Sequence, residues 1–181
     1  DHTEAWKMAR KVFFSKELTW TDEDFFLAEK IASKFPSDQA CMRLAGYAEH
    51  KLKDIARAES LYMKALKENP NLLSALSALE QVYEYGENWL ALQSIYLNQI
   101  NQFSSKPKKK IDYLYKIADL YWRRLRDYEK AEGTFAEILK LSPVENKAYI
   151  EMAKMLKSKK DFPSAKEKLR NLIFKDFSCE M

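Results

Sequence analysis

The side chains that most often carry out chemistry are few in this sequence, and their spacing suits no known kind of centre. The histidines are His2 and His50, and the cysteines are Cys41 and Cys179. A zinc site needs several Cys or His ligands at short spacings such as CxxC, and covalent catalysis needs a nucleophile beside a general base. Neither pattern occurs. We therefore predict no catalytic residue, no metal ligand and no cofactor, and we expect a protein that is not an enzyme.

Two further patterns are also better explained by structure than by chemistry. Glu23 and Asp24 form a carboxylate pair, but they lie in the first turn of an expected helix, where negative charge favours the helix dipole. The three glycines, at positions 46, 86 and 133, are too scattered to form a loop that cradles phosphate. These residues give no support for acid–base or nucleotide chemistry.

Basic residues are unevenly distributed and raise the question of nucleic acid. Residues 1–90 hold 12 Lys and Arg against 15 Asp and Glu, whereas residues 91–181 hold 19 against 12. A connecting stretch, FSSKPKKK (103–110), is rich in lysine, and Arg123, Arg124 and Arg126 follow it. Lysines that contact phosphates give salt-dependent, sequence-blind affinity. The stretch lacks the interleaved aromatic residues on which single-stranded bases stack, so nucleic acid is not the favoured partner.

Composition indicates an all-α fold. Hydrophobic residues make up 46% of the 181 residues, while there are only three glycines and five prolines to make the turns of a β fold. No apolar run reaches the length of a membrane span, so no membrane insertion is expected. Sparse cysteine favours a reducing, cytoplasmic location. The chain begins with Asp1 rather than Met, and we expect that its N-terminus, with any targeting signal, is missing.

The sequence repeats with an offset of 73 residues. The offset places Asp54 on Asp127, Ala58 on Ala131 and Pro70 on Pro143. Each block holds two helix-turn-helix units, because apolar residues recur at helical spacing between capping residues and prolines. Asp54, Asn88, Asp127 and Asp161 are expected to cap second helices, Asp22 is expected to cap another, and Gly86 is expected to end a helix. The first helices of the units at 38–70 and 111–143 carry one extra residue before the capping Asp.

This pattern resembles the tetratricopeptide repeat family. The stretch at 54–71 matches through Ala58, Tyr62, Ala65 and Pro70; that at 127–143 matches through Ala131, Phe135 and Pro143; that at 146–169 matches through Tyr149, Met152, Ala153, Leu156, Ala165 and Leu169. The resemblance implies a right-handed α-helical solenoid of antiparallel helix pairs. The expected repeats are a degenerate one at 1–36, three at 37–71, 72–105 and 106–144, and a last one at 145–181 with a capping helix, all in one continuous domain.

In this family the first helix of each repeat lines the concave surface, so the resemblance implies a binding groove there. Candidate groove residues are Arg43, Gln81, Glu84, Tyr85, Tyr115, Asp119, Trp122, Arg123 and Lys154. Trp, Tyr and Arg dominate interface energetics, although each aromatic side chain could instead pack against the next repeat. The Lys, Asn and Arg pattern of repeats that clamp a C-terminal carboxylate is absent.

The predicted function is a non-enzymatic scaffold that binds a partner peptide or helix in this groove. Two alternatives stay open. The chain could be a module of a larger solenoid or self-associate through its ends, because apolar residues of the last helix, including Leu169 and Ile173, must be capped or paired. It could also bind RNA through its basic C-terminal half.

Overall fold

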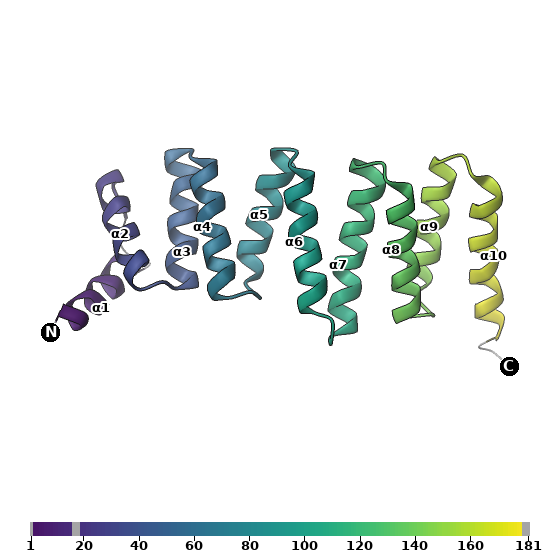
Figure 1. Cartoon of the computed structure of the whole chain (residues 1–181), viewed down its shortest axis with the longest axis horizontal. Helices are drawn as coiled ribbons and strands as arrows, with labels where there is room; N and C mark the ends of the chain where they lie inside the picture. The colour runs from purple at the N-terminus through teal and green to yellow at the C-terminus, as the bar shows by residue number, and fades with distance from the viewer. Residues whose placement is uncertain (1, 16–18, 179–181) are drawn as a thin grey trace. The chain divides into compact units, whose positions relative to one another are not determined.

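The computed structural model describes residues 2–15 and 19–178, and Cys179 lies outside them. Every regular element in these ranges is helical. The chain divides into two compact units, Asp1–Glu87 (unit 1) and Asn88–Met181 (unit 2). In each unit, successive helices lie side by side in opposite directions, except that α1 lies obliquely to α2 (Figure 1). This confirms the predicted all-α helical-repeat fold.

Both units are built from helix pairs. Unit 1 contains α1 (His2–Phe13), α2 (Asp22–Lys34), α3 (Asp38–Tyr47), the π-helical turn η1 (Ala48–Leu52), α4 (Ile55–Glu68) and α5 (Leu73–Tyr85). Unit 2 contains α6 (Trp89–Gln102), α7 (Pro107–Asp119), the π-helical turn η2 (Leu120–Arg124), α8 (Tyr128–Leu141), α9 (Asn146–Ser158) and α10 (Phe162–Ser178). No helix in the described ranges is both long and apolar enough to cross a membrane.

Four of the predicted helix caps are confirmed. The side-chain oxygen of Asp54 accepts the backbone N–H of Arg57 at 3.0 Å, and that of Asp127 accepts the backbone N–H of Lys130 at 3.1 Å. Asn88 and Asp161 cap α6 and α10 by equivalent bonds, to Ala91 and Ser164. Each bond satisfies a backbone donor that has no partner within its own helix.

The α2 cap was predicted one residue too late. Thr21 caps the helix, and Asp22 is its first residue. The Thr21 hydroxyl accepts the N–H of Asp24, whose carboxylate accepts the N–H of Thr21 at 2.9 Å. This reciprocal capping box satisfies two donors, whereas a cap at Asp22 would satisfy one.

Gly86 ends α5, as predicted, but its own backbone is not left-handed. Its φ is −81°, and the left-handed residue is Glu87, with φ 51°. Left-handed residues stand at the same place, immediately before the cap, in three other turns: Lys53, Arg126 and Lys160. The turns before α4, α6, α8 and α10 therefore share a left-handed residue just before the cap, and the sequence fills that position with charged residues.

The extra residue before Asp54 and before Asp127 is taken up by a π-helical turn. The bonding in η1 and η2 spans one residue more than in an α-helix. The N–H of Asp54 then bonds the carbonyl of Ala48 at 2.9 Å, and that of Asp127 bonds the carbonyl of Tyr121 at the same distance. Both caps therefore start the next helix in register despite the insertion.

Alanine lets the helices of each pair approach closely. Ala58 and Ala65 in α4 are fully buried, as is Ala131 in α8. Aromatic residues four positions after Ala58 and Ala131, Tyr62 and Phe135, are also buried. The motif residues that identified the repeats thus form the contact between first and second helices.

Candidate functional site

A hollow in unit 1 lies where the end of α1 meets α3 and the start of α5. A cavity of about 610 Å³ there is lined by Phe14, Asp38, Gln39, Met42, Arg43, Leu72 and Ser74; we call it the apolar hollow. Met42 and Leu72 pack against the buried cluster of Cys41, Ala65 and Ala75. The floor of the hollow is therefore held by the core, and α3 supplies most of its wall.

Trp20 fixes the end of α1 against α3. Its indole N–H donates to the carbonyl of Phe13 at 2.9 Å, and its ring packs edge-on against Phe14 with centroids 5.4 Å apart. On its other side Trp20 lies 5.8 Å from the ring of Tyr47. Because Tyr47 belongs to α3, these contacts determine where Phe14 stands at the edge of the apolar hollow.

Arg43, a predicted groove residue, lines this hollow. Its guanidinium donates to the carbonyl of Ser15 and lies 4.6 Å from the centre of the Trp20 ring. Partial burial lowers the pKa of Arg43 from its usual value. The side chain thus has a structural task, since it holds the segment after α1 against α3.

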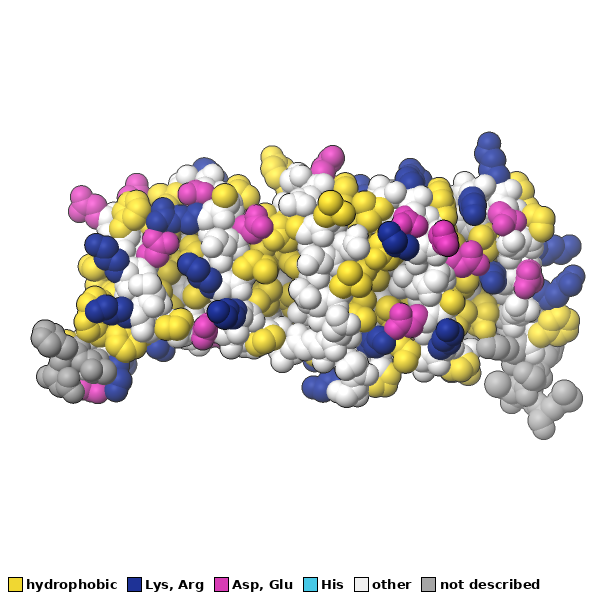
Figure 2. Space-filling model, in the orientation of Figure 1, with side chains coloured by type: hydrophobic (Ala, Val, Ile, Leu, Met, Phe, Trp, Pro, Cys, Tyr) yellow, Lys and Arg dark blue, Asp and Glu magenta, His cyan; other side chains and the backbone are white. Residues whose placement is uncertain are grey.

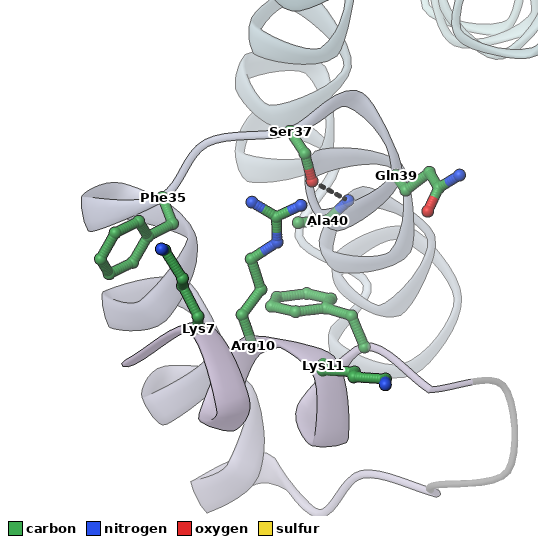
Figure 3. A pocket seen from close by; sticks show the side chains of 8 residues that line it. Lys7, Arg10, Lys11, Phe35, Ser37, Gln39 and Ala40 are labelled. Atoms are coloured by element: carbon green, nitrogen blue, oxygen red, sulfur yellow. Dashed lines mark hydrogen bonds between the residues drawn. The ribbon is translucent and has the colours of Figure 1, made fainter. Parts of the chain in front are cut away.

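A second cavity, of about 520 Å³, lies between α1 and the start of α3; we call it the basic cavity. Its lining residues are Lys7, Arg10, Lys11, Phe14, Phe35, Ser37, Gln39 and Ala40. Figure 3 shows the guanidinium of Arg10 extending from α1 toward Ser37. The Ser37 hydroxyl accepts the N–H of Ala40 at 3.2 Å and so caps α3 at this wall. The cavity shares Phe14 and Gln39 with the apolar hollow.

Sequence reasoning did not find the basic cavity, although a signal was present. Lys7, Arg10 and Lys11 are spaced so that they share one face of a helix, and Glu4 is the only acidic residue in α1. The groove residues predicted from the sequence include none of these three cations.

The other predicted residues of unit 1 lie on the last turns of α5. Gln81, Glu84 and Tyr85 are all exposed, and Tyr85 is the extreme case, with 94% of its surface accessible. None of the three lines either cavity. The structure therefore brings Arg43 to a hollow and leaves the other three on open surface.

The two predicted aromatic residues of unit 2 are held by packing. Trp122 is buried, and its indole N–H donates to the Ser158 hydroxyl at 3.0 Å. Tyr115 is half-buried; its hydroxyl lies 3.2 Å from Glu145, and the Lys147 ammonium lies 4.4 Å from the centre of its ring. Both side chains contact the following helix pair, which is the alternative that the sequence left open.

The predicted charged residues of unit 2 are paired with neighbours on their own helical face. Arg123 bonds Asp119 and stands over the ring of Trp122. Lys154 donates to Glu151 at 2.8 Å. The pairs are solvent-exposed, so each contributes little to stability, but each reduces the charge available to a ligand.

The lysine-rich stretch was expected to be a connection between helices, but its second half is helical. Pro107 begins α7, so Lys108, Lys109 and Lys110 lie in a helical first turn. Proline suits this position because its missing N–H would have no helical partner there. Lys110 pairs with Glu137 at 2.7 Å, and Lys109 lies over the Phe103 ring. On the face drawn in Figure 2, Lys and Arg of unit 2 are interspersed with Asp and Glu rather than gathered in one patch.

Three tyrosines form a recurring contact with glutamates of neighbouring helices or turns. The hydroxyls of Tyr62 and Tyr83 donate to Glu49 and Glu59 at 2.7 and 2.8 Å, and Tyr115 makes the equivalent bond to Glu145. The pKa of each of these tyrosines is raised above its usual range, mainly by burial and secondarily by the neighbouring carboxylate. These bonds join successive elements and have no ligand-binding geometry of their own.

Nothing in the described ranges is arranged as a metal centre. No group of three or more His, Cys, Asp or Glu side chains is close enough there to hold an ion. Cys41 is buried, and desolvation raises the pKa of its thiol, which opposes a nucleophilic role.

Comparison with known proteins agrees with the repeat structure. A family model described as tetratricopeptide repeat matches residues 38–72 and 111–145. No curated protein matches the chain. The first range contains α3–η1–α4, and the second contains most of α7 with all of η2 and α8, so both include a π-helical turn.

Solved structures with a similar fold include two of MamA and one of PilF. A MamA crystal structure has a TM-score of 0.55 at 14% identity, with 96% of this chain and 91% of that chain covered. MamA from Desulfovibrio magneticus RS-1 gives 0.52 at 16%, covering 98% and 97%. PilF from Pseudomonas aeruginosa gives 0.50 at 16%, covering 93% and 77%. The family match therefore identifies residues 38–72 and 111–145 as tetratricopeptide repeats.

Proposed function

We propose that the chain is a non-enzymatic scaffold whose unit 1 binds a peptide segment of a partner protein in the apolar hollow. Tetratricopeptide repeats serve typically as interaction scaffolds, and the fold places the hollow on first helices, which line the binding surface in this family. The observation that carries the proposal is the composition of the hollow. Phe14, Met42 and Leu72 provide apolar surface. Gln39 and Ser74 provide side chains that can form hydrogen bonds with a peptide backbone.

The size of the hollow suits one or two side chains of a ligand. At about 610 Å³ it lies within the usual range for a small binding site, and its apolar floor is anchored to the core. A rigid floor lowers the ordering cost of binding, because the receptor does not rearrange. An apolar anchor with polar contacts at the rim is the usual composition of such a site.

The test fills the hollow without disturbing the core. Ser74 is exposed at its rim, so Ser74→Trp places a large ring in the space; Ser60→Trp, on the exposed face of α4, is the matched control. Peptides of about ten residues are selected from a display library against the wild-type chain, and their affinities are measured by fluorescence anisotropy. We expect Ser74→Trp to weaken binding at least about tenfold and Ser60→Trp to leave it unchanged. Equal binding by both variants, each verified as folded by circular dichroism, would show that the hollow is not the site.

A further inference from the structure

The cations of the basic cavity stand on one face of α1 and are only partly paired. Lys7 bonds Glu4 at 2.8 Å, and Glu4 is the only acid of that helix. Arg10 and Lys11 have no acidic partner among the residues that the structure describes. Arg10 is half-buried, so its charge is less screened by solvent than that of a fully exposed residue. The cavity therefore presents net positive charge.

The opposite wall adds to this potential and brings no acid into the cavity. The wall is the first turn of α3, whose backbone donors carry partial positive charge. The nearest acid along the chain, Asp38, lines the apolar hollow and not the basic cavity. Its carboxylate accepts bonds from Asn69 at 2.9 Å and from the N–H of Gln39 at 2.7 Å, which lower the pKa of Asp38. Asp38 is thus occupied within the protein.

The basic cavity and the apolar hollow form one surface with two chemistries. They meet at Phe14 and Gln39, which line both. A ligand that lies across both must offer an apolar group at one end and negative charge at the other. A peptide segment provides these in adjacent residues, since successive side chains can enter neighbouring hollows.

We propose that the basic cavity of unit 1 binds the carboxylates of an acidic segment in the partner peptide, next to an apolar anchor that occupies the apolar hollow. This inference rests on the proposed function and states the chemistry of the partner. Arg10 provides the principal contact, because its guanidinium enters the cavity and can bond a carboxylate with two N–H groups. Lys7 and Lys11 add longer-range attraction at the rim.

The experiment compares two fluorescein-labelled peptides of about ten residues that share a Leu-Phe anchor. One carries four glutamates after the anchor, and the other carries four glutamines. Affinity is measured by anisotropy at about 50 and about 300 mM salt. We expect the glutamate peptide to bind at least about tenfold more tightly at low salt and to lose most of that advantage at high salt.

Charge-reversal variants assign the selectivity to the cavity. Arg10→Glu is expected to abolish the preference for glutamate, and Arg10→Gln is expected to reduce it. Lys30→Glu, on the exposed face of α2, makes the same charge change away from the cavity and is expected to retain most of the preference. A glutamate preference that survives Arg10→Glu would overturn the proposal.

The remaining outcomes separate this inference from the proposed function. If both peptides bind equally and Ser74→Trp weakens both, the hollow binds peptide and the acidic specificity is wrong. If neither peptide binds the wild-type chain, the inference fails, while peptides selected from a library still test the hollow. If inorganic phosphate alone displaces the glutamate peptide while Ser74→Trp has no effect, the cavity is a site for free anions and not for a peptide.

Discussion

Basic and aromatic residues proposed or predicted to bind a partner occur in both units, but they differ in pairing and burial. In unit 1, Arg10 and Lys11 line a cavity and have no acidic partner among the described residues. In unit 2, Arg123 and Lys154 are paired with acids on their own helices. The aromatic residues differ in the same way: Tyr85 is almost fully exposed, whereas Trp122 is buried and bonded to Ser158 of α9.

This contrast shows that residue type does not determine availability in a helical repeat. A basic or aromatic residue on a first helix is open to a ligand only if neither its own helix nor an adjacent one provides a partner for it. Ser158 provides one for Trp122, and Asp119 provides one for Arg123. Burial and pairing, rather than Trp and Arg enrichment, therefore distinguish the proposed site from the rest of the surface.

The largest expected effect concerns the two aromatic residues. Trp122→Ala should lower the free energy of unfolding by about 3–5 kcal/mol, because it opens a cavity and leaves the Ser158 hydroxyl without its donor. Tyr85→Ala should change it by less than about 0.5 kcal/mol, since the side chain touches little. Urea denaturation followed by circular dichroism measures both. Similar small losses for the two variants would contradict the contrast between packed and open aromatic residues.

The tyrosine–glutamate bonds should give the protein a stability that declines in alkali. The pKa of Tyr62, Tyr83 and Tyr115 is raised above the unfolded value of 10.0. The unfolded chain therefore releases these protons first, so the contribution is complete below pH 10 and is lost as pH rises above 10. The free energy of unfolding should fall from pH 10 to 11.

Phenylalanine substitutions sharpen this comparison between the units. Each Tyr→Phe change should cost about 0.5–1.5 kcal/mol at neutral pH and should flatten the alkaline decline. Tyr62→Phe with Tyr83→Phe should flatten it more than Tyr115→Phe does, because two of the groups are in unit 1. Urea midpoints at several pH values provide the measurement. An unchanged slope in the double variant would mean that other groups cause the decline.

The smallest effect is expected from the paired charges of unit 2. Arg123→Gln with Lys154→Gln should change stability by less than about 0.5 kcal/mol, because exposed pairs on one helix contribute little. The affinity of the glutamate peptide should change less than about twofold, against a larger loss for Arg10→Gln. Isothermal titration calorimetry of both variants tests the difference. Equal losses would mean that cations of both units contact the glutamate peptide.

Local features of the fold could be predicted from the sequence because they depend on neighbouring residues. Asp54 and Asp127 cap their helices by bonds to residues three positions later, so the prediction needed no distant contact. Ala58 and Ala131 were found because close helix crossings require small side chains. The spacing of the sequence showed an extra residue before Asp54 and before Asp127. It did not show that a π-helical turn would accommodate that residue.

The candidate site was harder to predict because it depends on contacts between elements distant in sequence. The bond from Arg43 to the carbonyl of Ser15 spans 28 residues, and the bond from Trp122 to Ser158 spans 36. A helical face can be assigned from periodicity, but the neighbour that covers it cannot. The spacing of the cations in α1 could be recognised in the sequence. The cavity that α1 and α3 form around them could not.

The π-helical turns give the array a structural unit larger than one repeat. Among the described residues, η1 and η2 follow α3 and α7, and no such turn follows α5 or α9. The alternation makes two successive repeats the smallest segment that can be excised or duplicated with every junction preserved. An engineer who lengthens or shortens this protein should therefore work in blocks of two repeats, since adding or removing one would bring together two turns of the same kind.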